Sequence, residues 1–297
     1  MTSEATVINP EFRDDRVLAL LSPANVLKLP LFKERLPEVF PGVDVIAPRG
    51  VEHMHEIVER SKSTHRLVLA VGGDGTLHQA LRRLCLANQV LGVLPSGTGN
   101  DVARVLGFPK NIKDRIRRLA AMRALPTDFG TLNRRRFINS GGFGIDSHVL
   151  NTMRQGKGFI ARNYNAAFIN TLFRLPGFKG RVRFDGGDCA DSFFWILAMN
   201  TPNIGGGTLI APRAELDDGK LDLLLVRETS RLDLLKFFPA ALRGAHLKLP
   251  PVVFAQVAEA NVTLEEPVEY IALDGELVYC GKREIEIKAQ QGLRFLR

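Results

Sequence analysis

One stretch of the chain, Val68–Leu77, limits what the protein can fold into more than any other. Apolar residues suited to a buried strand run into a turn with glycine at positions 72, 73 and 75, and a helix is expected to start at Thr76. This strand–turn–helix pattern is typical of a parallel α/β sheet, and it presents backbone N–H groups and a helix N-terminus to an anion such as phosphate. The glycines predict positive φ or close backbone approach. Taken alone, the pattern also fits an ordinary strand–helix turn.

A second glycine-rich turn follows the next strand and favours a ligand site. Val90–Leu94 is typical of a strand, Pro95–Asp101 forms the loop, and Val102–Leu106 predicts a short helix with Asn100 as its N-cap. In a parallel α/β sheet both loops fall at the same edge, where ligands bind. Asp74 in the first turn would repel bare phosphate, so its carboxylate indicates a bound Mg²⁺ or a ribose hydroxyl.

Neither turn matches a named phosphate-binding motif. His78 occupies the place of the third glycine of the dinucleotide fingerprint, and no Gly-Lys-Ser/Thr ends a Walker loop anywhere in the sequence. The chain also lacks the Gly-x-Ser-x-Gly elbow of a serine nucleophile. Any group transfer is therefore expected to be direct, without a covalent enzyme intermediate.

Composition narrows the class of protein and its partners. At 297 residues we expect one large or two modest domains, and no apolar run approaches the ~18 residues of a membrane span. The three cysteines form no metal or disulfide pattern, and no signal peptide is evident, so a cytoplasmic protein is expected. The net charge of +8 favours an anionic partner such as nucleotide or an anionic membrane surface.

Two basic clusters, Lys110–Arg118 and Arg134–Arg136, stand out along the chain. Neither is interleaved with aromatic residues for base stacking and no nucleic-acid motif accompanies them, so we expect no nucleic-acid partner. The first cluster, together with Arg104, is a candidate for membrane contact, and a solvated helix face is the alternative.

The order of the predicted elements divides the chain near Pro126. Strands and helices alternate up to about residue 123, which indicates a doubly wound α/β domain over residues 1–126. From residue 127 to 297 short strands predominate and predict a β-sandwich, whose extreme C-terminus packs back on the first domain. The expected elements are strands at 17–21, 43–46, 181–184, 192–199, 221–226, 252–256, 260–264, 268–273 and 283–287, a hairpin at 128–139, and helices at 31–39, 51–61, 112–122, 145–153, 159–175 and 232–242.

Two histidines, His53 and His55, lie two residues apart on one predicted helix. Residues at that spacing point to different faces, so they do not form a pair of metal ligands. We expect both side chains at the surface.

The two glycine turns, Gly72–Thr76 and Pro95–Arg104, together resemble the diacylglycerol kinase catalytic domain of the soluble bacterial lipid kinases, which are related to diacylglycerol and sphingosine kinases. Three later segments follow in the family's order, at Asn139–Asp146, 205–219 and Leu273–Glu276. The resemblance implies an α/β plus β fold, in which an N-terminal NAD-kinase-like doubly wound α/β domain precedes a C-terminal β-sandwich domain that binds lipid. It also implies ATP and Mg²⁺ as cofactors.

The resemblance carries over to particular residues of the nucleotide site. The residues implied to line the ATP site are Gly72, Gly73, Asp74, Gly75, Thr76, Leu77, His78 and Thr98. This chain departs from the family in two places. The positions after Leu77 are usually Asn-Glu and are here His78-Gln79, and the first loop, Ser22–Asn25, keeps the proline but lacks the glycine.

The resemblance also assigns a metal turn and a general base. A structural Mg²⁺ is implied at the Asp218 side chain and at the backbone carbonyls of Glu215 and Lys220, although adjacent aspartates in a turn are often only solvated. Glu276 is the implied base for the acceptor hydroxyl. The residues alone also fit a plain hairpin there, because Asp-Gly is the commonest hairpin signal.

The resulting prediction is an ATP- and Mg²⁺-dependent lipid kinase that transfers the γ-phosphate of ATP to a lipid hydroxyl, converting diacylglycerol to phosphatidate. Three alternatives stay open: a kinase for a sphingoid base, ceramide or monoacylglycerol, an NAD kinase, and a non-catalytic nucleotide-binding sensor. Pro95–Arg104 and Asp274–Glu276 argue against the NAD kinase. We expect a cytoplasmic protein that associates reversibly with a peripheral anionic membrane surface, and the sequence leaves a monomer and a homodimer open.

Overall fold

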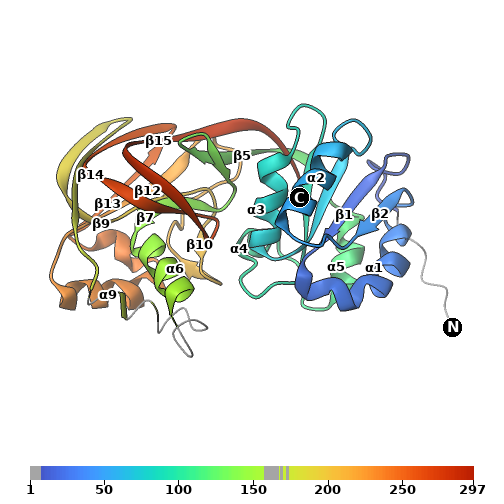
Figure 1. The fold of residues 1–297 in the computed structure, drawn as a ribbon, viewed down its shortest axis with the longest axis horizontal. Helices are drawn as coiled ribbons and strands as arrows, with labels where there is room; N and C mark the ends of the chain where they lie inside the picture. Colours follow the sequence, from blue (N-terminus) through green and yellow to red (C-terminus); the bar gives the residue numbers. More distant parts are fainter. Residues whose placement is uncertain (1–7, 157–166, 168–169, 172–173) are drawn as a thin grey trace. The chain divides into compact units, whose positions relative to one another are not determined.

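The computed structural model describes residues 8–156, 167, 170–171 and 174–297. The chain forms two compact units, which are drawn in Figure 1. Unit 1 comprises Met1–Thr127 with Gln291–Arg297, and unit 2 comprises Asp128–Gln290.

Unit 1 is built on a parallel sheet with the strand order β4-β3-β1-β2. The end of β15 adds a further parallel strand beside β4, where Arg294 and Phe295 lie opposite Val90 and Leu91. Every residue of β1, β3 and β4 is buried, as expected for near-continuous apolar strands of a parallel sheet. The strands are β1 Val17–Leu21, β2 Val43–Ile46, β3 Leu67–Gly72 and β4 Val90–Pro95.

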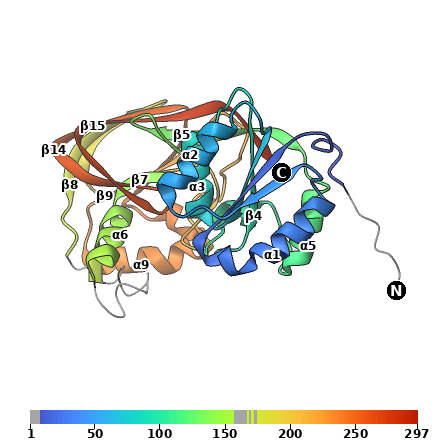
Figure 2. The same cartoon turned by 45° about the vertical axis from the view of Figure 1, so that its right-hand side comes forward.

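Helices cover both faces of this sheet, with α2 and α3 on one face and α1 and α5 on the other (Figures 1 and 2). This arrangement confirms the predicted doubly wound α/β organisation. The helices of unit 1 are η1 Pro23–Lys28, α1 Leu29–Arg35, η2 Leu36–Glu38, α2 Val51–Ser61, α3 Asp74–Arg83, α4 Asp101–Val105 and α5 Ile112–Leu119.

Three expectations about these helices were wrong. The helix expected at 31–39 is split into α1 and the 3₁₀ turn η2, because Pro37 has no N–H to continue the α-helical ladder. Helix α5 ends at Leu119 rather than at residue 122. His55 is buried, not exposed, and its Nε2 lies 2.9 Å from Oε1 of Gln79 on the neighbouring helix α3.

Unit 2 is dominated by antiparallel strands, which follow the order β13-β12-β9-β7-β14-β15 with β8 paired to both β9 and β14. Their inward side chains form one apolar core that includes Phe143, Phe193, Ile196, Val262 and Ile271. The strands are β5 Ala124–Leu132, β6 Arg135–Phe137, β7 Ser140–Gly144, β8 Phe178–Phe184, β9 Gly187–Met199, β10 Asn203–Ile204, β11 Thr208–Leu209, β12 Leu221–Arg227, β13 Val252–Val257, β14 Glu259–Leu273 and β15 Glu276–Leu296.

The strands of unit 2 are longer than the sequence predicted. The segments expected at 260–264 and 268–273 form one strand, β14, whose pairing with β15 shifts register on either side of Val268. Such a shift absorbs extra residues without ending the strand, and Pro267, which has no N–H to give to a ladder, lies in the shifted region. The strand expected at 283–287 is a part of β15, which is 21 residues long.

Two helices cover a second apolar cluster of unit 2. Helix α6, Ile145–Gln155, and helix α9, Arg231–Ala241, pack on a group that contains Phe194, Trp195 and Leu234. A 3₁₀ turn, η3 Ala245–Lys248, follows α9. Most of the helix expected at 159–175 lies outside the described residues. Within the described parts of the chain, no helix is both long enough and apolar enough to cross a membrane.

Candidate functional site

The two glycine turns of unit 1 touch each other at the carboxyl ends of β3 and β4. The amide of Ser96 donates to the carbonyl of Gly72 across 2.9 Å. A Cβ added to Gly97 would lie 2.6 Å from the Cα of Gly73, and a Cβ added to Gly73 would lie 3.2 Å from the Cα of Gly97. Gly97 therefore has no room for a side chain, and Gly73 has little, because the two backbones pack directly on each other.

Close approach, and not positive φ, explains Gly72 and Gly73 in the first turn. Gly73 has φ −99°, and Gly72, Gly73 and Gly75 are all absent from the positive-φ residues of the described chain, so the second of the two expected reasons applies at Gly72 and Gly73. A side chain at Gly72 would overlap the hydroxyl of Thr76 one turn into the following helix.

Helix α3 starts at Asp74, two residues earlier than predicted. Gly73 is its N-cap in an extended conformation, and the Gly73 carbonyl accepts the amides of Thr76 at 3.1 Å and Leu77 at 3.2 Å. The first turn of the helix therefore includes the whole of the Asp74–Thr76 segment. The positive end of the helix dipole lies at this turn, where it favours an anion.

Two side chains fix the second loop. Oδ2 of Asp74 accepts a hydrogen bond from the backbone N–H of Asp101, with 3.2 Å between the two atoms, and this bond joins the first turn to the start of α4. Asn100 has φ 51° and its Oδ1 accepts the amide of Gly97 at 3.1 Å, but its side chain makes no cap bond to α4. The predicted N-cap residue is thus in the cap position, while its amide shapes the loop itself.

A buried asparagine that the sequence analysis did not single out holds three loops together. Asn25 in η1 is 1% exposed, and its Nδ2 lies 3.0 Å from Oγ of Ser22, 3.1 Å from the carbonyl of Val71 and 2.5 Å from Oγ of Ser96. The amide thereby links the ends of β1, β3 and β4. A buried side-chain amide needs such partners, so an asparagine in the loop after a buried strand was the available signal.

The other residues predicted to line the ATP site differ in their exposure to solvent. Leu77 and His78 are 0% and 1% exposed, so neither residue presents its side chain or its backbone to a ligand in this structure. Thr98 is exposed on the second loop. Gln79, which replaces the usual glutamate of the family, faces His55 and so has a structural partner in this chain.

The basic helix α5 supports the second loop as well as carrying charge. The guanidinium of Arg115 donates to the carbonyls of Pro109 at 2.7 Å and Pro95 at 2.5 Å. Arg118 donates to the carbonyl of Leu106 at 2.8 Å. Part of the cluster predicted for membrane contact is therefore engaged with backbone carbonyls.

The turn predicted to hold Mg²⁺ lies before β12 in unit 2. Oδ1 of Asp218 accepts a hydrogen bond of 2.9 Å from the backbone N–H of Lys220. The buried Asp128 accepts one of 2.6 Å from the backbone N–H of Gly219. Glu215, Asp218 and Lys220 are all exposed. The available donors are carboxylate and carbonyl oxygens, which are the ligands of a hard cation.

Asp222 is a buried carboxyl group in β12, close in sequence to this turn. It is 2% exposed, and its Oδ2 has no hydrogen-bond partner. Burial is the main cause that raises the pKa of Asp222 to about 6; the charges of Asp218 and Glu215 act in the same direction, and the Gln256 hydrogen bond opposes them. Among the described residues no three His, Cys, Asp or Glu side chains form a metal cluster, but one carboxylate with two carbonyls does not require such a cluster. The residues present therefore fit a cation.

The turn before Glu276 is a tight hairpin, and hydrogen bonds between the Asp274 carboxylate and a neighbouring segment fix it in place. Asp274 and Gly275 have φ 50° and 83°, as in a type I′ turn, and Leu273 pairs with Glu276 across it. The Asp274 carboxylate is buried and accepts the amides of Ile138, Asn139 and Ser140 at 2.7–3.1 Å. Glu276 itself is exposed at the first position of β15.

A second carboxyl group of unit 2 lies inside the protein, at the start of α6. Asp146 is 5% exposed, and burial raises its pKa to about 7, although the amide of Ser147 donates to its Oδ1 at 2.7 Å and opposes the shift. The indole N–H of Trp195 opposes it too, without the geometry of a normal hydrogen bond. The sequence placed Asp146 in a family motif without a role, and a strongly shifted pKa is a common property of functional sites.

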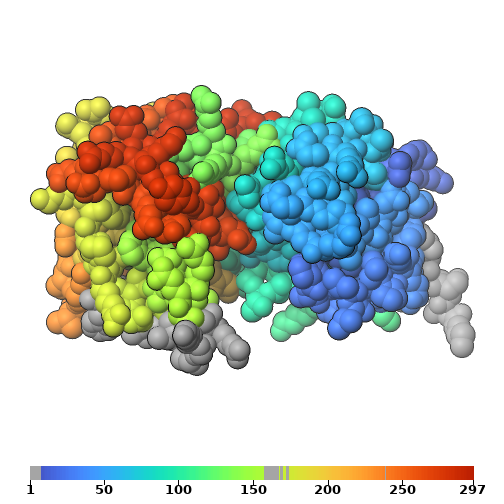
Figure 3. Space-filling model, in the orientation of Figure 1, coloured from blue at the N-terminus to red at the C-terminus, as the bar shows by residue number. Residues whose placement is uncertain are grey.

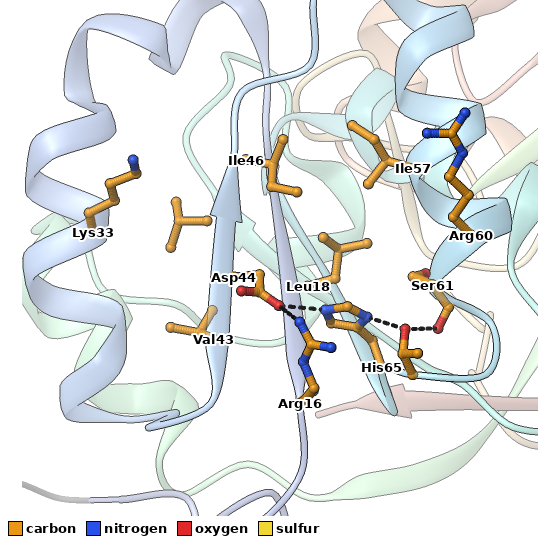
Figure 4. A pocket seen from close by; sticks show the side chains of 12 residues that line it. Arg16, Leu18, Lys33, Val43, Asp44, Ile46, Ile57, Arg60, Ser61 and His65 are labelled. Carbon is orange, nitrogen blue, oxygen red and sulfur yellow. Dashed lines mark hydrogen bonds and ion pairs between the residues drawn. The ribbon is translucent and has the colours of Figure 1, made fainter.

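A cavity of about 700 Å³ lies along the outer strand β2 of unit 1 (Figure 4). Within it Asp44 accepts hydrogen bonds from Arg16 at 2.6 Å and from Nε2 of His65 at 2.7 Å, and these partners hold the pKa of Asp44 below its ordinary value. Arg16 and His65 precede the amino ends of β1 and β3. The glycine turns lie at the carboxyl ends, so this cavity is separate from them.

Comparison with known proteins identifies the family. The family model described as the diacylglycerol kinase catalytic domain matches residues 25–132, and the one described as the YegS C-terminal NAD kinase beta sandwich-like domain matches residues 139–289. A protein of Mycobacterium tuberculosis named diacylglycerol kinase is 32% identical over 248 residues, which cover 79% of each chain. The chain belongs to the diacylglycerol kinase family.

A further relative and a solved structure are also similar to the chain. A Bacillus subtilis protein named diacylglycerol kinase is 29% identical over 229 residues, which cover 75% of each chain. A solved structure of a diacylglycerol kinase from Bacillus anthracis has a TM-score of 0.70 and 20% identity, covering 95% of this chain and 96% of that one. The predicted fold class, an NAD-kinase-like α/β domain followed by a β-sandwich, is confirmed.

Proposed function

We propose that this member of the diacylglycerol kinase family is an ATP- and Mg²⁺-dependent lipid kinase that phosphorylates diacylglycerol to phosphatidate. One observation carries the proposal: two glycine turns at the carboxyl ends of neighbouring parallel strands pack on each other at Gly73 and Gly97. Backbone amides in such turns suit phosphate groups.

In this proposal the nucleotide phosphates bind at the first turn and the second loop. The backbone of Gly72–Thr76 and the N-terminus of α3 attract the negative charge, and the exposed Thr98 adds a hydroxyl. Leu77 and His78 are buried within α3, so in this proposal they support the first turn from behind and do not touch the nucleotide. Asp74 keeps the two loops in place through the amide of Asp101.

We propose Asp218, with the carbonyls of Glu215 and Lys220, as the site of a structural Mg²⁺ in unit 2. A divalent cation there would be held by the Asp218 carboxylate and the two carbonyls, and it would neutralise carboxylate charge and fix the turn before β12. A second Mg²⁺ is expected to arrive with ATP and to neutralise charge on its phosphates.

Glu276 is proposed as the general base. As the new bond forms between the lipid hydroxyl oxygen and the γ-phosphorus, the bond from that phosphorus to the β,γ-bridging oxygen breaks and ADP leaves. The hydroxyl proton passes to the Glu276 carboxylate. The Asp274 contacts to three successive amides hold the hairpin that carries this carboxylate, so its backbone position is fixed before substrate binds.

The substrate lipid requires the protein to visit a membrane. We propose that the protein is cytoplasmic and associates reversibly with anionic lipid, which its net charge of +8 supports.

The test is an assay with radiolabelled ATP and a panel of lipids in mixed micelles: diacylglycerol, monoacylglycerol, ceramide and a sphingoid base, with NAD as a further acceptor. We expect labelled phosphatidate from diacylglycerol. Labelling of another lipid alone would reassign the acceptor, and labelling of NAD or of no acceptor would refute the lipid kinase.

The base is tested by Glu276→Gln, which keeps size and polarity but removes the basic oxygen. General-base catalysis contributes about 10²–10⁴-fold, so we expect kcat to fall by that factor while ATP affinity stays nearly unchanged. Glu284→Gln, an exposed residue of the same strand, is the matched control. A loss of ATP affinity would make Glu276 a nucleotide or metal ligand instead, and an unchanged kcat with rate-limiting chemistry would remove it from the mechanism.

A further inference from the structure

Helix α9 of unit 2 has apolar side chains on two opposite faces. Its inner face is packed, because Leu234, Phe237 and Ala241 are 1%, 3% and 0% exposed. The Phe237 ring lies edge-on to Trp195 with the ring centroids 6.2 Å apart. At the start of the helix Arg231 donates to the carbonyl of Leu175 at 2.5 Å. The inner face alone therefore accounts for the attachment of α9 to unit 2.

The outer face of α9 is apolar and, in the part of the chain that the structure describes, exposed. Leu232, Leu235 and Leu242 are 72%, 36% and 56% exposed, and Pro239 is exposed as well. Their spacing of three, four and three residues places them in one stripe along the helix. Figures 1 and 2 show α9 on the outside of unit 2 beside α6. In Figure 3 orange atoms of this part of the chain are visible at the surface of unit 2. A stripe of exposed aliphatic side chains indicates a surface that meets an apolar partner.

Positive charge flanks this stripe. Residues 231–248 contain four lysine or arginine side chains and one carboxylate, Asp233. That carboxylate is engaged by Lys236 at 2.7 Å and by the hydroxyl of Ser230 at 2.7 Å. Arg243 and Lys248 are exposed just beyond the helix. An apolar stripe with cations along its border matches a helix that lies in the interface of an anionic membrane.

We infer that the outer face of α9, formed by Leu232, Leu235 and Pro239 with Leu242 just past its end, inserts into the interface of an anionic lipid bilayer, while Arg243 and Lys248 contact the headgroups. The inference rests on the proposed function, because a lipid kinase must reach a substrate that stays in the membrane. It adds which surface makes the contact.

A second copy of the chain fits this face less well than a bilayer does. The helix of 11 residues is about 17 Å long, whereas a stable protein interface needs about 800 Å² and 20–30 residues from each partner. Two copies would also bring the same positive charges together, which disfavours their contact. A bilayer imposes neither requirement.

The first experiment measures binding to sedimenting vesicles of phosphatidylcholine with one quarter phosphatidylglycerol. The variant carries Leu232→Gln, Leu235→Gln and Leu242→Gln, and the control carries Val51→Gln and Leu125→Gln, which are 47% and 41% exposed in unit 1. A fully buried leucine contributes a factor of about ten to binding. Because the three leucines are expected to insert only in part, their loss together should weaken vesicle binding by about tenfold or more. The control should bind like the wild type.

A second variant tests the charges without touching the apolar stripe. Arg243→Gln with Lys248→Gln should weaken binding to the phosphatidylglycerol vesicles several-fold and leave circular dichroism and melting temperature unchanged, because both side chains are exposed. Equal affinity of the wild type for pure phosphatidylcholine vesicles would overturn the headgroup contact.

A third measurement separates this inference from the proposed function. Wild type and leucine variant are assayed with short-chain dioctanoylglycerol in solution and with long-chain diacylglycerol in vesicles. The variant should lose activity on vesicles and keep it in solution. If the wild type phosphorylates neither lipid, the proposed function fails and the vesicle-binding result still decides the docking face. Unchanged vesicle binding by the leucine variant would overturn the inference, as would a wild-type dimer that this variant converts to a monomer.

Discussion

Replacing Asp146 with asparagine should remove a penalty that the folded protein carries at neutral pH. In the native state the carboxyl group is buried at the start of α6, and its pKa is raised from 3.8 to about 7. In the unfolded chain it titrates near the ordinary value. Between these two values the folded state holds a proton that the unfolded state has released, so stability falls as the pH rises through this window.

The size of the effect follows from the shift. About three pKa units at 1.36 kcal/mol each amount to about 4 kcal/mol, lost progressively between roughly pH 4 and pH 7. Asparagine has no charge to bury, and its Oδ1 can still accept the hydrogen bond from the backbone N–H of Ser147. Asp146→Asn should therefore match the wild type near pH 4 and exceed its free energy of unfolding by up to about 4 kcal/mol at pH 8.

The fluorescence of Trp195 gives a direct assay. It is the only tryptophan of the sequence, and it belongs to the same apolar cluster as Ile145, the neighbour of Asp146. Thermal or urea unfolding followed by this signal from pH 4 to pH 8 reports on the part of the protein that contains the mutation. Asp191→Asn, an exposed position on the same strand as Trp195, serves as the control.

Two results would contradict this reasoning. A constant difference between wild type and Asp146→Asn across the whole pH range would mean that Asp146 does not change its protonation between the folded and unfolded states in this window. A wild type that gains stability relative to the variant as the pH rises would mean that the folded protein prefers the ionised carboxylate.

Three further predictions concern other parts of the structure. Gly97→Val should push the two nucleotide loops apart, because even a Cβ there lies 2.6 Å from the Cα of Gly73, and calorimetry should show loss of ATP binding with the fold retained. The lowered pKa of Asp44 gives a stabilising contribution that is present above about pH 4 and lost as the pH falls through its folded pKa, so melting curves of Asp44→Ala and wild type should converge in acid. If Asp218 holds a structural Mg²⁺, Asp218→Ala should lower both melting temperature and kinase activity and excess Mg²⁺ should restore little, so an unaltered melting temperature with full turnover would remove that ion.

The strands of unit 1 could be predicted because a single physical pattern dominates them. In β1, β3 and β4 both faces are buried, so the sequence is apolar throughout, and the predicted bounds differ from the observed ones by a residue at most. Helix ends depend instead on one or two local bonds. Helix α3 starts early because the Gly73 carbonyl accepts the amides of Thr76 and Leu77, and this is not visible in the composition of the turn.

Strand β7 was missed for a different reason. Glycine-rich Ser140–Gly144 has low strand propensity, yet it is fully buried between β9 and β14. A Cβ on Gly141 would lie 2.6 Å from the ring of Phe137, and one on Gly142 would lie 2.5 Å from the carbonyl of Ile196. These glycines result from tertiary packing, and a single sequence does not show which segments will be adjacent.

The glycine turns of the candidate site could be predicted from the sequence, but the buried polar residues could not. The glycine turns stand out because their residues are rare and clustered. Asn25, His55 and Asp146 do not, because each is a polar residue whose environment comes from elements far away in the sequence. His55 was expected at the surface from its own helix alone, and the partner that explains its burial, Gln79, comes from α3. Glu276 and the Asp218 turn remain predictions about function.

The discontinuity of unit 1 has a consequence for biosynthesis. Its strand β4 leads into the second glycine turn and pairs with Arg294 and Phe295, which are translated after the whole of unit 2. Leu296 packs on Gly92 of the same strand, where a Cβ would meet it at 3.2 Å. A nascent chain can therefore complete unit 2, which is one continuous segment, before the sheet of unit 1 is closed. We expect ribosome-stalled chains that end at residue 290 to leave the edge of β4 open, so that nucleotide binding is acquired only when the last strand has been made.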